Sequence, residues 1–351
     1  MKATFSLKHI LRITDHIGII EHCIFTKPNR KEGYCVDDNA RALSACLKID
    51  GKEKKTAQKL IPIYLEFLVR ACDKKGFHQD LNLDLTWKDN TGVREGFGRA
   101  MVALAETTLS ARQDKQKSTA AFIFDQQAFL IPSIKYQKVM AHVIIAISKR
   151  IKASEKEKFD FYDKKSLNLK KELIILSDKL IKDYQKYSSK SWKWYKDVIN
   201  YDNGRLPLSL FFAFQVTKNQ QYLKVAKESL DFLIKQTYNQ AKDYFSFVGN
   251  EGWYPKDKRP AIFDQQPIEA GSIVEVCVKA YEVLKDPKYL HFAKIAFLWY
   301  SGKNILGLPM IDNLTGGIYD GLKSKKINQN EGAESVLSYV LACLALKEIK
   351  Q

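Results

Sequence analysis

The hydrophobic pattern of the chain is helical almost from end to end. In one set of segments apolar residues recur every three or four positions beside a Lys-rich face, which predicts half-exposed helices. A second set is rich in small residues and apolar on most sides, which predicts buried helices. The half-exposed set comprises residues 54–72, 117–133, 167–187, 221–235 and 288–300, of which 117–133 is poorly defined. The buried set comprises residues 39–49, 97–109, 139–147, 206–214, 268–284 and 333–346.

The two kinds of helix alternate along the chain, at intervals of roughly 60 residues. This order predicts an all-α (α/α)6 toroid, in which one ring of six helices lies inside another. No half-exposed helix follows the sixth buried helix, so we expect residues 5–13 to supply that partner and close the ring. An open α-solenoid is the alternative, but it predicts closely similar repeats, which residue identity does not show.

Few other elements are expected. The segments 244–248 and 316–319 predict short hairpin pieces within loops. No Gly-, Ser- or Pro-rich linker divides the chain. We therefore expect a single domain over residues 1–351.

Composition narrows the class of protein. The 351 residues are 45% hydrophobic with only 17 Gly and 9 Pro, which excludes a disordered or collagen-like chain. The apolar stretch 335–346 is too short to span a bilayer, and no long apolar segment follows the first Lys. We therefore expect neither a membrane span nor a signal peptide. The six Cys residues are widely spaced without a CxxC pair, which favours reduced thiols in a cytoplasmic protein.

The formal net charge of +17 raises the question of nucleic-acid binding. Only 10 of the 57 basic residues are Arg, the side chain that reads bases and phosphates through bidentate contacts. The Lys residues are scattered and mostly mixed with Asp and Glu. We therefore interpret the charge as a solvated surface and expect no nucleic-acid partner, while the oligomeric state stays open.

Polar residues gather just before five of the six buried helices. Their motifs are GYCVDDNAR (33–41), REGFGR (94–99), YDNGRLP (201–207), FDQQPIE (263–269) and NQNEGAE (328–334). In a toroid the N-termini of the inner helices point to one mouth. We therefore expect these carboxylates, amides and guanidiniums to line one pocket.

Helix capping is the competing interpretation of these motifs. Asp38, Asn203 and Asn330 have the side chains of N-caps, and Pro267 suits a first helical position. Asp37 and Arg41 have the i,i+4 spacing of an ion pair. Capping explains one acid per helix, but not two or three polar residues that continue into an apolar helix.

Aromatic residues lie beside the same motifs. Trp and Tyr rings next to carboxylates and amides are typical of a sugar-binding surface, with core or core-edge packing as the alternative. The eight residues are Tyr34, Trp87, Trp192, Trp194, Tyr195, Tyr201, Trp253 and Tyr254.

Other chemistries lack a motif. The sequence contains no P-loop, no dinucleotide-binding fingerprint and no serine nucleophile elbow. It has no HExxH motif, and no two His residues lie three or four positions apart. We therefore expect no cofactor and no metal.

Several segments resemble a bacterial family of (α/α)6-barrel proteins associated with glycosidases and glycosyltransferases, within the six-hairpin glycosidase class. The matching pieces are HILRITD (9–15) with Gly18 and His22, GYCVDDNARAL (33–43), EGFGRAMVAL (95–104), YDNGRLPLSL (201–210), FDQQPIEA (263–270) and NEGAESVLSY (330–339). The resemblance runs almost end to end and implies a toroid that acts on carbohydrate. The chain departs from it at Glu95, where the family string has Asp.

Together these features predict a glycoside hydrolase that works through carboxylate acid–base chemistry on an oligosaccharide. The candidate catalytic residues are Asp37, Asp38, Glu95, Glu269, Glu331 and Glu334. The candidate substrate-binding residues are Tyr34, Asn39, Arg41, Trp87, Arg99, Trp194, Tyr201, Asp202, Asn203, Arg205, Trp253, Gln266 and Asn330. Two alternatives stay open: a sugar epimerase or isomerase, for which His22 and His78 could supply a base, and a non-catalytic saccharide-binding module.

Overall fold

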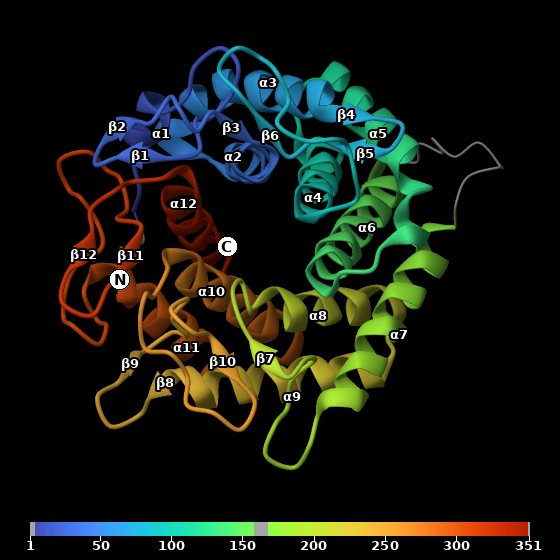
Figure 1. The fold of residues 1–351 in the computed structure, drawn as a ribbon. Coiled ribbons are helices and arrows are strands. Elements are labelled where there is room, and N and C mark those ends of the chain that lie inside the picture. Colours follow the sequence, from blue (N-terminus) through green and yellow to red (C-terminus); the bar gives the residue numbers. More distant parts are fainter. Residues whose placement is uncertain (1–3, 158–167, 350–351) are drawn as a thin grey trace. The chain divides into compact units, whose positions relative to one another are not determined.

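The computed structural model describes residues 4–157 and 168–349 (Figure 1). The chain forms two compact units. Unit 1 consists of Met1–Ile10, Cys23–Lys27 and Lys179–Gln351, and unit 2 of Leu11–His22 and Pro28–Asp178. A single domain over residues 1–351 stays a prediction.

Unit 2 is built on three neighbouring buried helices, α2 (Val36–Lys48), α4 (Glu95–Ser110) and α6 (Gln137–Glu157). Helix α4 packs against both α2 and α6 (Figure 1). Helix α3 (Lys54–Ala71) covers α2, and α5 (Asp114–Ala128) covers α4. A Cβ atom on Gly98 would lie 2.8 Å from Cβ of His142, so the glycine lets α4 approach α6.

Unit 1 repeats this plan with α8 (Arg205–Thr217), α10 (Pro267–Leu284) and α12 (Ala333–Glu348) as its buried helices. Helix α10 packs against both α8 and α12. Helix α9 (Gln220–Thr237) covers α8, and α11 (Pro287–Leu298) covers α10 (Figure 1). Every helix predicted from the periodicity therefore has a counterpart. The counterpart of 167–187 is α7 (Leu169–Tyr187), and residue 167 lies outside the described residues.

The N-terminal segment packs against α12, as the ring-closing prediction requires. The Tyr339 hydroxyl donates to the carbonyl oxygen of Thr4 at 2.8 Å, and Nζ of Lys347 lies over the Phe5 ring. The helix here, α1 (Lys8–Arg12), is only five residues long. It is thus a much smaller partner than the other outer helices.

The remaining elements are short. The 3-10 helices are η1 (Gly51–Glu53), η2 (Ile131–Ser133) and η3 (Trp299–Ser301). The strands have two residues each: β1 (Cys23–Ile24), β2 (Lys27–Pro28), β3 (Tyr34–Cys35), β4 (Cys72–Asp73), β5 (Gly76–Phe77), β6 (Asp80–Leu81), β7 (Val198–Ile199), β8 (Tyr238–Asn239), β9 (Tyr244–Phe245), β10 (Tyr254–Pro255), β11 (Gly321–Leu322) and β12 (Ile327–Asn328).

Of the two predicted hairpin pieces, 244–248 contains β9, which pairs with β8. In 316–319 only Ile318 forms a bridge, to Ile311, and the strand β11 begins two residues further on. All six Cys residues are free thiols, and all but Cys72 are buried. Across the helices that the structure describes, none is both long and apolar enough to cross a membrane.

Candidate functional site

The predicted helix caps are wrong at three of the four positions. Helix α2 begins at Val36, and its N-cap is Cys35, whose Sγ accepts a hydrogen bond from the backbone N–H of Asp38. Glycines occupy the N-cap positions of α8 and α12, where Asn203 and Asn330 were expected. Pro267 is the first residue of α10, as predicted.

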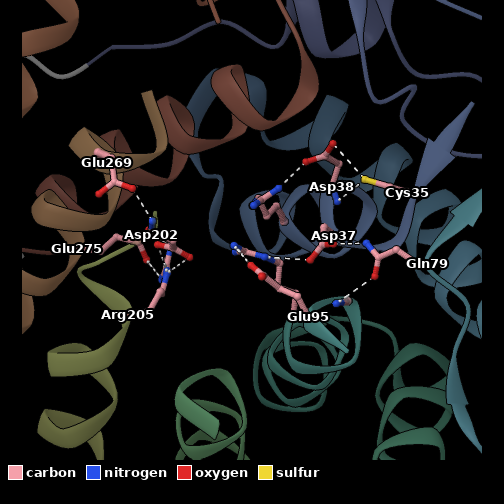
Figure 2. Close-up of polar contacts among 12 residues, drawn as sticks. Cys35, Asp37, Asp38, Gln79, Glu95, Asp202, Arg205, Glu269 and Glu275 are labelled. Atoms are coloured by element: carbon pink, nitrogen blue, oxygen red, sulfur yellow. Dashed lines mark hydrogen bonds and ion pairs between the residues drawn. The ribbon is translucent and has the colours of Figure 1, made fainter. Parts of the chain in front are cut away.

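In unit 2 the N-terminal ends of α2 and α4 meet at a buried guanidinium (Figure 2). Nε of Arg99 lies 3.0 Å from Oδ1 of Asp37, and its Nη2 lies 2.9 Å from Oε1 of Glu95. The side chain of Gln79 donates to Oδ2 of Asp37 and accepts from the backbone N–H of Gly96. We call Asp37, Gln79, Glu95 and Arg99 the α2–α4 cluster.

The side chains of the α2–α4 cluster differ in solvent exposure: the guanidinium is buried and the two carboxylates are partly exposed. The Arg99 side chain is only 4% exposed, whereas Asp37 is 15% and Glu95 25% exposed. A buried charge is stable only when it is paired, and Arg99 pairs with both carboxylates. These carboxylates, fixed by Arg99, still present part of their surface to solvent.

Asp38, the next residue of α2, belongs to a separate buried pair. Arg41 donates to its Oδ1 at 2.6 Å, and the Cys35 thiol donates to its Oδ2 at 3.2 Å (Figure 2). Glu21 joins them, because one ligand atom of each of Glu21, Cys35 and Asp38 lies within 4.8 Å of the others.

Glu21, Cys35 and Asp38 have the spacing of metal ligands, but the charge and protonation of their surroundings do not suit a cation. Burial and the nearby Asp38 raise the pKa of Cys35 well above its usual range, so the thiol keeps its proton. The Arg41 guanidinium already pairs with the Asp38 carboxylate. A guanidinium and a protonated thiol on one carboxylate leave little room for a cation, since a metal-bound thiol is deprotonated.

Glu21 is a functional candidate that sequence reasoning missed. Burial and the nearby Asp38 raise its pKa to about 7, although its side chain is 27% exposed. Its backbone N–H donates to the carbonyl oxygen of Gly33, and Nε2 of His22 lies 3.5 Å from its Oε1. Glu21 precedes no buried helix, so a search for polar residues at helix starts passes it over.

In unit 1 the N-terminal ends of α8 and α10 carry a second group of polar residues, which Glu275 joins from the middle of α10. We call Asp202, Asn203, Arg205, Glu269 and Glu275 the α8–α10 cluster. Arg205 binds both oxygens of Glu275, at 2.7 and 2.9 Å, and its Nε lies 3.1 Å from Oδ1 of Asp202 (Figure 2). The Glu269 carboxylate accepts from the backbone N–H of Asp202 and from the Asn203 side chain. Asp202 and Glu269 are buried, so this cluster has a structural role: it fixes the segment before α8 to the start of α10.

Glu331, another predicted catalytic acid, is fully buried beside the N-terminal segment. Nε2 of His9 lies 2.8 Å from the carbonyl oxygen of Glu331 and must donate, because a carbonyl only accepts. Nδ1 of His9 lies 3.2 Å from Oε2 of Glu331, which also accepts from Thr315. These contacts tie the N-terminal segment to the start of α12 and suit a structural role.

Several predicted binding residues form hydrogen bonds within the protein. The Asn39 amide accepts from the N–H of Ile19 and donates to the carbonyl of Cys35. The Tyr34 hydroxyl donates to Asp15, and Asn330 accepts from the N–H of Phe25. Two other predicted residues are half-buried: the binding candidate Gln266, the N-cap of α10, and the catalytic candidate Glu334, in the first turn of α12.

The predicted aromatic platforms divide in the same way. Trp194 is 1% exposed and packs edge-on against Tyr195, so the core alternative fits it and a platform role does not. Trp87 is half-buried and stacks on His78, with ring centroids 4.6 Å apart. Trp253 and Tyr201 are half-buried, with ring centroids 6.3 Å apart. Convergence of all five motifs on one pocket stays a prediction.

The chain is similar in fold to solved structures of sugar-active enzymes. It matches a cellobiose 2-epimerase from Bacillus thermoamylovorans with a TM-score of 0.73 at 13% identity, covering 99% of this chain and 96% of that one. A D-mannose isomerase matches with a TM-score of 0.69 at 12% identity, covering 97% and 96%. A GH76 α-mannanase from Bacteroides thetaiotaomicron matches with a TM-score of 0.66 at 12% identity, covering 98% and 94%.

No protein-family model and no curated protein matches this chain. At identities this low, the structural matches show the fold alone. The fold class predicted from the helical pattern, an all-α (α/α)6 toroid, is confirmed.

Proposed function

We propose that this protein is a carbohydrate-active enzyme that hydrolyses a glycosidic bond, with the α2–α4 cluster at its catalytic centre. One observation carries the proposal: a single buried guanidinium, Arg99, holds two partly exposed carboxylates, Asp37 and Glu95, from neighbouring helices. Glycoside hydrolysis needs fixed, solvent-reachable carboxyl groups. The fold supports the proposal, since solved structures with the same fold include a GH76 α-mannanase.

Hydrolysis also needs a group that still carries a proton near neutral pH. Glu21 fits this role, because burial and Asp38 raise its pKa to about 7 while part of its side chain stays exposed. Protonated Glu21 would donate to the leaving oxygen. Asp37 or Glu95 would act as base or nucleophile, because Arg99 pairs with both.

The test compares two Glu–Arg pairs of equal spacing. Glu95 and Arg99 form an i,i+4 pair on α4, and Glu66 and Arg70 form one on the exposed face of α3. The full-length protein and its Glu95→Gln and Glu66→Gln variants would be assayed for release of reducing ends from manno- and cello-oligosaccharides. Loss of a catalytic carboxylate typically lowers the rate about 10²–10⁴-fold, so we expect that loss for Glu95→Gln only. Equal turnover in the two variants would refute the assignment.

A sugar epimerase or isomerase is the second candidate, favoured by one observation. His22 lies 3.5 Å from Glu21 and is exposed, which gives a reachable His–carboxyl pair suited to moving a proton at a sugar carbon. Incubation of mono- and disaccharides in deuterated water separates the two reactions. Deuterium on a sugar carbon without bond cleavage indicates the epimerase or isomerase, whereas new reducing ends indicate hydrolysis. Binding without either product would indicate the saccharide-binding module.

A further inference from the structure

Gln79 in unit 2 connects the first turns of two buried helices. Its side chain donates to Oδ2 of Asp37 on α2 and accepts from the backbone N–H of Gly96 on α4 at 3.2 Å (Figure 2). Its carbonyl oxygen accepts from the N–H of Val36, the first residue of α2, at 2.8 Å. Main chain and side chain of this one residue are therefore bound to the helices that carry the α2–α4 cluster.

The loop that carries Gln79 holds it through a second set of contacts. The backbone N–H of Gln79 donates to Oδ1 of Asp89 at 2.8 Å, and Oδ2 of Asp89 pairs with Arg94 at 2.7 Å. The carbonyl oxygen of Asp89 accepts from Nδ1 of His78 at 2.6 Å, because a carbonyl oxygen cannot donate. These contacts do not involve Asp37, so the loop positions the amide independently of the carboxylate that the amide binds.

The contact with Gly96 decides which end of the amide faces Asp37. A backbone N–H only donates, so the amide oxygen of Gln79 lies towards Gly96 and the amide nitrogen lies towards Asp37. A Cβ atom on Gly96 would lie 2.4 Å from that oxygen, so the glycine allows this close approach. The opposite orientation of the amide would set two donors against each other at Gly96.

Both oxygens of Asp37 therefore face groups that only donate. Oδ2 meets the amide nitrogen of Gln79, and Oδ1 lies 3.0 Å from Nε of Arg99. An ionised carboxylate is a pure acceptor and forms charge-assisted contacts with both groups. Because the Asp37 side chain is also 15% exposed, this arrangement suits a reachable base or nucleophile better than a proton donor.

We propose that Gln79 is a positioning residue of the catalytic centre, whose amide N–H fixes the carboxylate of Asp37 in the orientation that the reaction uses. Asp37 then acts as the base or nucleophile, and Gln79 acts through it without being a catalytic residue itself. This role rests on the proposed function, whereas the hydrogen bond to Asp37 does not. A residue 42 positions further along the chain thus sets the geometry of the carboxylate.

The test uses the proton of an introduced carboxyl group. Gln79→Glu can donate to Asp37 only while it is protonated, whereas Gln79→Leu cannot donate at any pH. Gln215 supplies the matched control, because its half-buried amide donates to Glu282 at 3.0 Å and accepts from Lys279 at 3.4 Å. The full-length wild-type protein, the two Gln79 variants, Gln215→Glu and Gln215→Leu would be assayed for kcat and KM on manno- and cello-oligosaccharides from pH 5 to 8.

We expect Gln79→Leu to lower kcat by up to about 100-fold with little change in KM, because a misplaced catalytic group slows the chemical step. The kcat of Gln79→Glu, divided by that of the wild-type protein, should fall as pH rises from 5 to 8. Both Gln215 variants should keep the wild-type kcat. Wild-type kcat in folded Gln79→Leu, or a kcat ratio for Gln79→Glu that does not change with pH, would overturn the positioning role.

Urea denaturation of the same proteins tests the contact without turnover. The charged groups around it are Asp37 on α2, Glu95 and Arg99 on α4, and Asp80, Lys88, Asp89 and Arg94 in the loop. Carboxylates outnumber cations in this group, so the folded protein disfavours a further carboxylate beside Asp37. An unfolded Glu loses its proton at about pH 4, so the urea midpoint of Gln79→Glu, relative to the wild-type protein, should fall as pH rises from 4 to 8.

The two measurements separate a failure of this inference from a failure of the proposed function. Asp37→Asn combined with Gln79→Glu should reduce the fall in urea midpoint, because it removes the charge that repels the introduced carboxylate. A midpoint difference that is independent of pH overturns the contact between Gln79 and Asp37. Absence of turnover in the wild-type protein refutes the proposed function and the positioning role with it, even where the midpoint confirms the contact.

Discussion

The α2–α4 and α8–α10 clusters each place an Arg between an Asp and a Glu, but they differ in how much of the carboxylates solvent can reach. In unit 2 Arg99 lies between Asp37 and Glu95, and in unit 1 Arg205 lies between Asp202 and Glu275. Each cluster joins two neighbouring buried helices: Asp37 and Glu95 lie in the first turns of α2 and α4, whereas Glu275 lies in the middle of α10. Residue type alone therefore does not separate the proposed catalytic cluster from the structural one.

The difference lies in how fully the hydrogen bonds are used. Arg205 makes a bidentate pair with Glu275, while the Asp202 side chain is fully buried. The Glu269 carboxylate accepts hydrogen bonds from the backbone N–H of Asp202 and from the side chain of Asn203. In the α2–α4 cluster both carboxylates keep part of their surface in solvent. Solvent reaches these groups without breaking the cluster, as the proposed catalytic role requires.

The largest effect that this comparison predicts is on turnover. Asp37→Asn should lower the rate about 10²–10⁴-fold and lower the melting temperature less than Glu269→Gln does, because the partly exposed Asn can still accept from Gln79 and Glu95 still pairs with Arg99. Glu269→Gln should do the reverse: its amide would turn N–H groups towards the N–H of Asp202 and cost about 1–3 kcal/mol of stability. Rates on oligosaccharides and melting curves measure both. Equal rate losses per folded molecule would end the distinction between the clusters.

The next effect is on stability alone. Arg205→Met removes the partner of two carboxylates, one of them fully buried, and should lower the free energy of unfolding by about 3–5 kcal/mol. Arg99→Met leaves Asp37 and Glu95 closer to water, so we expect a loss of about 1–2 kcal/mol. Urea denaturation measures both values. A larger loss for Arg99→Met would show that unit 2 holds the structural cluster.

The helical pattern predicted the architecture because each helix type has its own signature. Inner helices such as α10 are apolar nearly all round, and outer helices such as α9 carry a Lys-rich stripe. Boundaries were less certain: the segment expected at 117–133 ends as a helix at Ala128 and continues as a 3-10 turn. The cap of α2 was missed because Cys35 is not among the residue types that usually cap helices.

The sites were harder to predict than the helices. Motifs identified Asp37, Glu95 and Glu269 alike, but only the distant contacts decide which of them stays reachable. Glu21 owes its raised pKa to its burial and to Asp38, which belongs to a different element of the chain. No local pattern carries that information.

A smaller effect concerns the pH dependence of unit 2. The folded state holds a proton on Glu21 up to about pH 7, whereas an unfolded Glu releases it near pH 4.5. Stability should therefore fall as pH rises between these values, by at most about 3 kcal/mol. Glu21→Gln should remove this slope and be the more stable protein above pH 7. Urea denaturation of both proteins from pH 4 to 8 provides the measurement, and parallel curves would contradict the raised pKa.

The smallest effect separates the helix starts of the two clusters. Cys35 caps α2 through its side chain, whereas Gly204 at the start of α8 has none to offer. Cys35→Ala should cost about 1 kcal/mol by leaving the N–H of Asp38 without its acceptor, and Cys35→Ser should retain most of that stability. The thiol also donates to the Asp38 carboxylate, so the serine hydroxyl must fill both roles from a shorter bond. Equal urea midpoints for Cys35→Ala and the wild-type protein would show that the cap contributes nothing. A loss in Cys35→Ser as large as in Cys35→Ala would show that the reach of sulfur, rather than hydrogen bonding in general, holds Asp38 in place.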